Sequence, residues 1–170
     1  MDKGLLHLYY GDGKGKTSAA IGLSVRALGR GKAVTFVQFL KDGSSGEIEP
    51  LRRLGAVVLS GYPGMKFVFQ MDEVEKAATL AWNNRILREA AETPCDLLVL
   101  DELCAARQFG LVDSDLAMQA VLERPADREV VVTGREPESW ILNAADYVTE
   151  MCSHRHPYDR GVPAREGIEF

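Results

Sequence analysis

An apolar segment that runs directly into a glycine-rich turn, and from there into a helical pattern, constrains the fold of this chain most strongly. Residues 5–10 read LLHLYY, residues 11–18 read GDGKGKTS, and residues 17–29 carry apolar side chains at helical spacing. Glycines let successive backbone N–H groups point inward, and the following helix N-terminus adds positive potential. The segment is therefore interpreted as a strand, a phosphate-binding loop and a helix.

The loop residues have separate expected roles. Lys16 is expected to meet phosphate charge, and the Thr17 hydroxyl is expected to ligate Mg²⁺. The other nucleotide-binding candidates in the loop are Gly11, Asp12, Gly13, Lys14, Gly15 and Ser18. Tyr10 stands where the strict Walker A pattern has its first glycine, and Lys16 stands where a dinucleotide fingerprint needs its third. Dinucleotide binding is therefore disfavoured, and a glycine-rich turn with two solvated lysines remains the structural alternative.

Short apolar, β-branched segments alternate with longer amphipathic segments along the rest of the chain. Strands are predicted at residues 5–10, 33–40, 56–60, 96–101, 128–133 and 147–151. Helices are predicted at residues 17–29, 72–92, 113–123 and 138–145. Glycine-rich residues 41–46 and 61–65 are expected to form mobile loops. The alternation predicts an α/β fold with a mostly parallel central sheet of about six strands flanked by helices.

The length and the net charge of the chain limit the number of domains and the classes of partner that we expect. With 170 residues, of which 46% are hydrophobic, the chain is expected to form one domain, residues 1–170. The net charge of -5 argues against nucleic acid and against an anionic membrane surface as partners. Cys95, Cys104 and Cys152 are odd in number and lack the spacing of a zinc site. They are interpreted as thiols in a reducing compartment, so a cytoplasmic location is expected.

Two further predicted strands end in charged residues. Residues 97–102 read LLVLDE, so Asp101 and Glu102 end a buried strand, as in a Walker B segment, where carboxylates hold Mg²⁺ directly or through water. Residues 133–135 read TGR, which puts Arg135 at the same carboxyl edge of the sheet. The alternatives are a solvated strand end for the two carboxylates and a surface ion pair for Arg135.

From end to end, the chain resembles the ATP:cob(I)alamin (corrinoid) adenosyltransferases that have a RecA-like P-loop fold. The segments that carry the resemblance are residues 11–17 (GDGKGKT), 37–41 (VQFLK), 100–103 (LDEL), 111–113 (LVD), 133–135 (TGR), 145–151 (ADYVTEM), 156–158 (HPY) and 167–170 (GIEF). The resemblance implies transfer of the 5′-deoxyadenosyl group of MgATP to the Co(I) centre of a corrinoid, with release of triphosphate, in adenosylcobalamin synthesis or salvage. Reduced cobalt would then be the attacking group, which explains why the sequence holds no recognisable protein nucleophile with its base.

The resemblance also implies roles for individual residues. Lys16, Glu102 and Arg135 are the implied catalytic residues, and Thr17, Asp101 and Glu102 are the implied metal ligands. Arg26 matches a basic residue near the nucleoside, with a solvated helix face as its alternative. The implied corrinoid-binding residues are Phe67, Phe69 and His156, and ordinary core packing is the alternative for the two phenylalanines.

The resemblance also implies cofactors and partners, and the sequence differs from the family pattern at a few positions. Mg²⁺ and ATP are implied, together with the corrinoid substrate, a flavoprotein-type electron donor and a homodimer. Phe69 stands where the family is expected to have Trp, and Cys104, Ala105 and Ala106 follow the Walker B acids where it usually has Asn and an aromatic residue. The competing interpretations are a small P-loop kinase or ATPase and a nucleotide-binding regulator without catalysis.

Overall fold

Within residues 3–169, which this computed structural model describes, six parallel strands form one sheet in the order β3-β2-β4-β5-β1-β6. The strands are β1 (Leu6–Tyr10), β2 (Val34–Gln38), β3 (Val57–Ser60), β4 (Leu97–Asp101), β5 (Glu129–Gly134) and β6 (Tyr147–Glu150). Every pair of neighbours is parallel, so the predicted α/β fold is confirmed and the sheet is parallel throughout.

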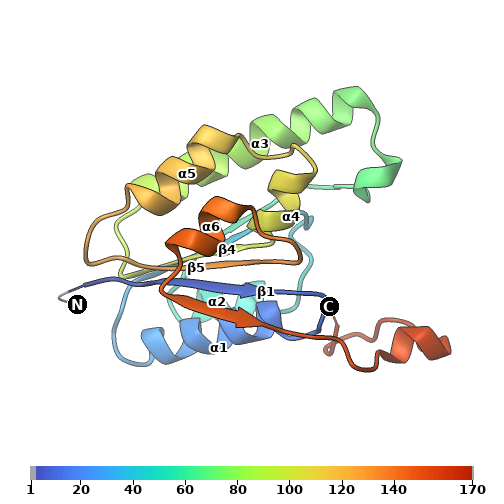
Figure 1. The fold of residues 1–170 in the computed structure, drawn as a ribbon, viewed down its shortest axis with the longest axis horizontal. Helices are drawn as coiled ribbons and strands as arrows, with labels where there is room; N and C mark the ends of the chain where they lie inside the picture. Colours follow the sequence, from blue (N-terminus) through green and yellow to red (C-terminus); the bar gives the residue numbers. More distant parts are fainter. Residues whose placement is uncertain (1–2, 170) are drawn as a thin grey trace.

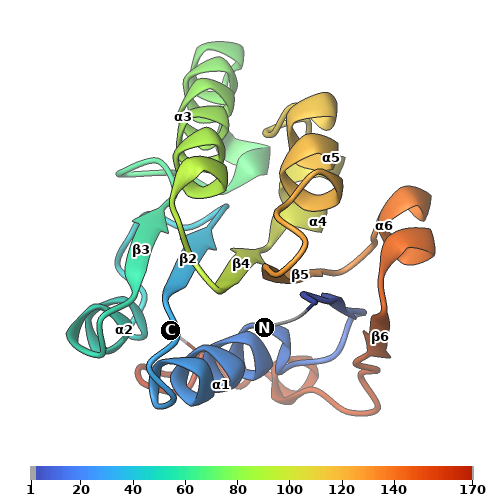
Figure 2. The same cartoon turned by 90° about the vertical axis from the view of Figure 1, so that its left-hand side faces the viewer.

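Helices cover both faces of the sheet (Figures 1 and 2). They are α1 (Lys16–Leu28), α2 (Ile48–Arg53), α3 (Glu73–Glu92), α4 (Leu103–Gln108), α5 (Ser114–Leu122) and α6 (Ser139–Ala144), with 3₁₀ turns at Val68–Gln70 and Pro157–Arg160. Figure 2 shows α1 and α2 on one face and α3 to α6 on the other. No helix of residues 3–169 is both long enough and apolar enough to cross a membrane.

The central strands are buried on both faces because side chains alternate along each strand. In β4, Leu98 and Leu100 belong to the core cluster under α3, α4 and α5. Leu97 and Val99 belong to the second cluster, which packs against α1 and α2. The edge strand β6 differs, since all four of its residues are exposed. The two clusters share one sheet, so the sheet is the centre of the fold.

The longest helix, α3, begins and ends at signals visible in the sequence. The Asp72 side chain accepts a hydrogen bond from the Glu75 backbone N–H at 2.8 Å, and the Glu75 side chain accepts from the Asp72 N–H at 3.1 Å. This reciprocal capping box starts the helix. Pro94 follows two residues after its last residue, Glu92, and cannot continue the helix.

Several predicted boundaries differ from the structure. The strand predicted at residues 33–40 ends at Gln38, because Leu40 adopts a left-handed backbone with φ 53° that no strand continues. The six-residue helices α2 and α4 were not predicted, since each presents only one or two turns of apolar spacing. The three cysteines are free thiols, as predicted.

The parallel arrangement brings the carboxyl ends of the strands to one edge. Tyr10 at the end of β1 is in register with Gly134 at the end of β5, and Gln38 at the end of β2 is in register with Asp101 at the end of β4. The loops that follow these four strands therefore meet at one edge, where ligands of open α/β sheets bind.

Candidate active site

A cavity of about 600 Å³ lies at this carboxyl edge. Its lining includes loop residues 12–18 together with Glu102 and Arg135, so the three predicted motifs meet around one space. Lys41, Glu47 and residues 167–169 complete much of the wall.

The glycines of the phosphate loop are needed for two reasons. Gly11 and Gly15 have φ values of 105° and 115°, which favour glycine. Gly13 instead lies against the segment that follows β6, and its N–H donates to the Met151 carbonyl at 2.6 Å. The Gly11 N–H likewise donates to the Arg135 carbonyl at 3.0 Å. Two N–H groups that the sequence suggested for phosphate thus bind protein carbonyls and join the loop to β5 and β6.

Gly13→Ala is expected to destabilise the loop because a Cβ at this position would lie 2.6 Å from Met151 O and 2.7 Å from Met151 C. Backbone must shift to relieve that overlap, which we expect to lower the free energy of unfolding by about 1–3 kcal/mol. Urea unfolding measures the change. Gly22→Ala in α1 is the matched control, since nothing lies within 4 Å of its added Cβ and helix propensity favours alanine. Equal stabilities of the Gly13→Ala and wild-type proteins would contradict the close approach.

Lys16 and Lys14, two residues apart, lie in different surroundings. Lys16 is 7% exposed, and its ammonium donates to the carbonyls of Gly11 at 2.8 Å and Gly13 at 2.6 Å. Burial lowers the pKa of Lys16, and the nearby Glu102 carboxylate opposes this effect. Lys14 is exposed and donates to Glu169 Oε1 at 2.7 Å. Lys16 therefore holds the loop in shape from inside, whereas Lys14 joins it to the end of the chain.

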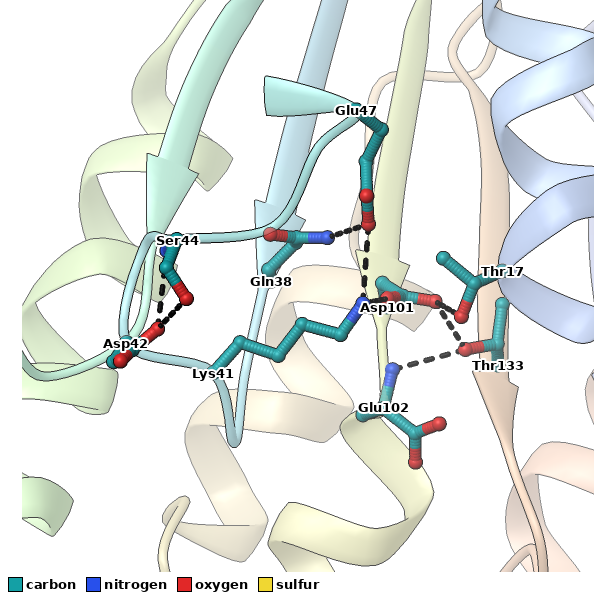
Figure 3. A network of polar contacts seen from close by, with 9 residues as sticks. All are labelled: Thr17, Gln38, Lys41, Asp42, Ser44, Glu47, Asp101, Glu102 and Thr133. Carbon is teal, nitrogen blue, oxygen red and sulfur yellow. Dashed lines mark hydrogen bonds and ion pairs between the residues drawn. The ribbon is translucent and has the colours of Figure 1, made fainter. Parts of the chain in front are cut away.

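Asp101 is the centre of a buried polar network (Figure 3). Its Oδ1 accepts hydrogen bonds from the hydroxyls of Thr17 at 2.9 Å and Thr133 at 2.8 Å. Its Oδ2 is buried and has no hydrogen-bond partner among the described residues. The Lys41 ammonium lies 3.7 Å from this oxygen. Burial raises the pKa of Asp101, and the charge of Lys41 opposes that rise.

Glu102 connects the Walker B strand to α4 through an unusual backbone. It has φ 62°, a left-handed value that is rare for a residue with a side chain, and its N–H donates to Thr133 Oγ1 at 2.9 Å. Burial raises the pKa of Glu102, and the neighbouring Asp101 carboxylate raises it further. Such local strain is typical of functional sites, and here it turns the Glu102 side chain into the cavity wall.

The residues around Asp101 fit a magnesium ion. The unpartnered Oδ2 of Asp101 is an available anionic oxygen, and the Thr17 hydroxyl lies beside the same carboxylate. Across residues 3–169, no group of three or more His, Cys, Asp and Glu side chains forms a metal cage. This donor set suits Mg²⁺, which takes one or two protein oxygens and completes its shell with phosphate and water.

The remaining nucleotide-site predictions have different outcomes. Arg135 and Ser18 line the cavity, and so does His156, whose Nδ1 accepts from the Tyr158 N–H at 3.3 Å. Arg26 does not line it, because α1 runs away from the loop and carries Arg26 to its exposed last turn, about 15 Å along the helix from Lys16. The structure therefore does not bring Arg26 together with the phosphate loop.

Phe67 and Phe69 are surface residues. Their side chains are 71% and 83% exposed, and their rings stack on each other with centroids 5.6 Å apart and planes 11° from parallel. They flank the start of the 3₁₀ turn Val68–Gln70 instead of lying on a strand. The alternative that they are core residues is therefore wrong.

Two parts of the wall were not assigned a role from the sequence. Glu47 carried no motif, and Lys41 belonged to a matching segment without an implied function. Residues 167–169 served only as a signature, yet Glu169 accepts from Lys14 and from Arg165, and these bonds lower its pKa to about 2. The Lys14 contacts with Ile168 O and Glu169 Oε1 bring the end of the described chain to the phosphate loop. Phe170, the last residue of that signature, lies outside the described residues.

Comparisons with known proteins agree with this geometry. Residues 2–170 match the sequence model of the family described as ATP:corrinoid adenosyltransferase BtuR/CobO/CobP. The chain is 36% identical to the corrinoid adenosyltransferase of Pseudomonas aeruginosa over 173 residues, which cover 99% of this chain and 85% of the relative. It is 34% identical to the corrinoid adenosyltransferase of Escherichia coli (strain K12) over 170 residues, which cover 99% and 87%.

A solved structure extends the likeness to the fold. The flagellar accessory protein FlaH from Methanocaldococcus jannaschii superposes with a TM-score of 0.56 at 16% identity, covering 88% of this chain and 72% of that one. At this identity the likeness concerns architecture alone, and it agrees with the predicted α/β fold.

Proposed function

The chain belongs to the ATP:corrinoid adenosyltransferase family, and from this premise we propose that its cavity joins the adenosyl group of MgATP to the Co(I) centre of a corrinoid and releases triphosphate. Adenosylation of a corrinoid with ATP is the activity of the family, and the assignment of residues and intermediates is our proposal. The observation that carries it is the meeting of the phosphate loop, Glu102 and Arg135 around one cavity beside the buried Asp101.

The phosphate side of the cavity supplies charge and alignment. Lys16 and Arg135 are proposed to stabilise the charge that builds on the departing triphosphate, and the loop backbone is proposed to hold the nucleotide in line with cobalt. Lys14 joins them once the nucleotide displaces its partner Glu169, because both anions compete for the same ammonium. The remaining proposed nucleotide contacts are Asp12, Gly15, Thr17 and Ser18. Gly11 and Gly13, whose N–H groups bind protein carbonyls, are proposed to shape the loop around the phosphates.

Thr17, Asp101 and Glu102 are the residues proposed to hold magnesium. When bound, the ion would neutralise phosphate charge and fix the orientation of the polyphosphate. Thr133 supports this role, since its hydroxyl binds both Asp101 Oδ1 and the Glu102 N–H and so fixes the two acids relative to each other.

The corrinoid side of the proposal rests on Phe67, Phe69 and His156. Two stacked, exposed aromatic rings are an apolar surface suited to a flat macrocycle. His156 lines the same cavity as the phosphate loop, so its proposed contact is where the corrin and the nucleotide approach each other. A flavoprotein-type donor is proposed to supply the electrons that make Co(I).

The whole chain, residues 1–170, is proposed to be one catalytic domain of a homodimer in the cytoplasm. Both core clusters pack on one sheet, which supports a single domain. Strand β6, with Tyr147 at 50% and Val148 at 47% exposure, offers an edge at which a second copy can pack. The three free thiols suit a reducing compartment.

Product analysis tests the proposed function. Under anaerobic conditions, the protein is incubated with MgATP and chemically reduced cob(I)alamin, and the phosphate product is separated by ion exchange. We expect one triphosphate for each adenosylated corrinoid, because the bond that breaks joins the ribose C5′ to its oxygen. Release of ADP would instead show a kinase or ATPase, and nucleotide binding without turnover would show a regulator.

A further inference from the structure

We propose that Lys41 is a further residue of the leaving-group site and contacts the polyphosphate of the nucleotide directly. The inference rests on the proposed function and adds a cation that comes from the loop after β2 and not from the phosphate loop.

Two backbone features fix the position of Lys41. It follows β2, whose last residue is in register with Asp101, so it lies at the same edge of the sheet as the Walker B acids. The left-handed Leu40 turns the chain immediately before it. Gly61, after β3, then packs so closely that a Cβ there would lie 2.3 Å from the Lys41 carbonyl oxygen. Lys41 is therefore held at the cavity edge by its own turn and by the neighbouring strand.

The Lys41 ammonium has unused hydrogen-bonding capacity. It donates to Glu47 Oε1 at 3.1 Å, but its distance of 3.7 Å from Asp101 Oδ2 is too long for a hydrogen bond (Figure 3). An ammonium has three N–H donors, and no other acceptor binds this one among the described residues. Lys14 and Lys16, by comparison, each bind two acceptors. Lys41 is thus the cavity lysine with the most free donors.

Glu47 explains why the ammonium stays at the cavity wall. The Glu47 carboxylate is fixed by Gln38, whose Nε2 donates to the same Oε1 at 2.6 Å. Because Gln38 is fully buried at the end of β2, this anchor is rigid. Glu47 therefore draws the ammonium away from Asp101 and leaves it facing the space that the nucleotide would fill.

The positive charge of Lys41 balances negative charge in the lining of the cavity. The cationic lining residues are Lys14, Lys16, Lys41 and Arg135, and the acidic ones are Asp12, Glu47, Glu102 and Glu169. The two sets balance, so removing Lys41 leaves a net negative wall facing an anionic substrate.

In the transfer, an electron pair of Co(I) forms the cobalt–carbon bond while the C5′–O bond breaks and its pair goes to the triphosphate. A cation on that oxygen chain favours the departure.

Calorimetric binding of inorganic triphosphate, in the presence of Mg²⁺ and without corrinoid, tests the proposal. Lys41→Met is expected to weaken triphosphate binding about tenfold to 150-fold, the loss typical of a hydrogen bond to a charged group. Lys41→Arg, which keeps the charge, should restore affinity to within about threefold. Adenosine binding should change less than about twofold in both variants, because the nucleoside lacks the charge that Lys41 binds.

Lys32→Met is the matched control, since Lys32 is also a partly exposed lysine paired with an aspartate, at 3.0 Å from Asp96, but does not line the cavity. Thermal unfolding of every variant is measured first, and Lys41→Gln carries the same expectation should the Met variant fail to fold. Wild-type triphosphate affinity in the Met or Gln variant would overturn the proposal. So would an equal loss of adenosine binding, or tighter Mn²⁺ binding with unchanged triphosphate binding, which would make Lys41 only the counter-charge of Asp101.

These measurements separate the two proposals. Triphosphate binding needs no turnover, so a wild-type protein that binds triphosphate through Lys41 but forms no adenosylated corrinoid would refute the proposed function alone. An active wild-type enzyme whose Lys41 variants bind triphosphate normally would refute the role of Lys41 alone.

Discussion

Lys16→Ala is expected to abolish measurable MgATP binding and to lower adenosyl transfer by at least about 10²- to 10³-fold, the range found when one charge-stabilising donor is removed from an active site. The buried ammonium has two functions in the structure. It binds the carbonyls of Gly11 and Gly13, which shapes the loop, and it supplies positive charge where phosphate would bind. Alanine removes both, while the strands and core clusters that hold the fold do not include Lys16.

Titration with a fluorescent ATP analogue and a triphosphate assay measure the effect, and circular dichroism checks that the variant is folded. Lys14→Ala is the comparison, because Lys14 is exposed and already paired with Glu169, so its loss should cost much less. A folded Lys16→Ala protein with wild-type affinity and turnover would show that the loop is only a glycine-rich turn.

The double variant Phe67→Ala/Phe69→Ala is expected to keep MgATP affinity near the wild-type value but to lose most conversion of Co(II) corrinoid. The two rings do not line the nucleotide cavity and are largely exposed, so neither nucleotide binding nor stability depends on them. An apolar surface against the lower corrin face would exclude an axial donor and make Co(II) easier to reduce. Reaction with chemically pre-reduced Co(I) should therefore suffer much less.

The electron paramagnetic resonance spectrum of bound Co(II) in the presence of MgATP provides the decisive measurement. Wild type should show four-coordinate cobalt, and the double variant should show the five-coordinate form. Leu54→Ala is the control, because Leu54 is an exposed apolar residue at the end of α2 that does not line the cavity. If the double variant gives as much four-coordinate cobalt as the wild type, the phenylalanines do not bind the corrinoid.

Much of the fold follows from local signals. The strand, turn and helix of residues 5–29 are encoded within a short stretch and formed where predicted. The helix predicted at residues 72–92 also formed, and the structure shows that a capping box starts it. Helix α2 was missed because its six residues depend on tertiary packing, with Ile48 and Leu51 buried under the sheet. The sequence pattern also indicated a strand at β6, but the exposure of its side chains depends on its place at the edge of the sheet.

The candidate site was predictable where it depends on strand ends and not where it depends on loops. Glu102 and Arg135 approach the phosphate loop because parallel strands share a carboxyl edge. The contact of Lys41 with Glu47 requires the left-handed turn at Leu40, and no sequence pattern marks that turn. The contact of Arg26 with the nucleoside was expected from its motif. Arg26 lies in the last turn of α1 and does not line the cavity, so this contact stays a prediction.

The order of the strands in the sheet also determines the order in which they can pair during synthesis of the chain. Strands β2, β3 and β4 neighbour one another and can pair as soon as residues 34–101 have been synthesised. Strand β1, made first, has only late neighbours, since Leu6 pairs with Val130 and His7 with Tyr147. At about 5–20 residues per second, it waits on the order of ten seconds on the ribosome for them. The phosphate loop also needs Met151, whose carbonyl accepts a hydrogen bond from the Gly13 N–H. The loop is therefore among the last parts of the chain to fold, although it is among the first to be translated.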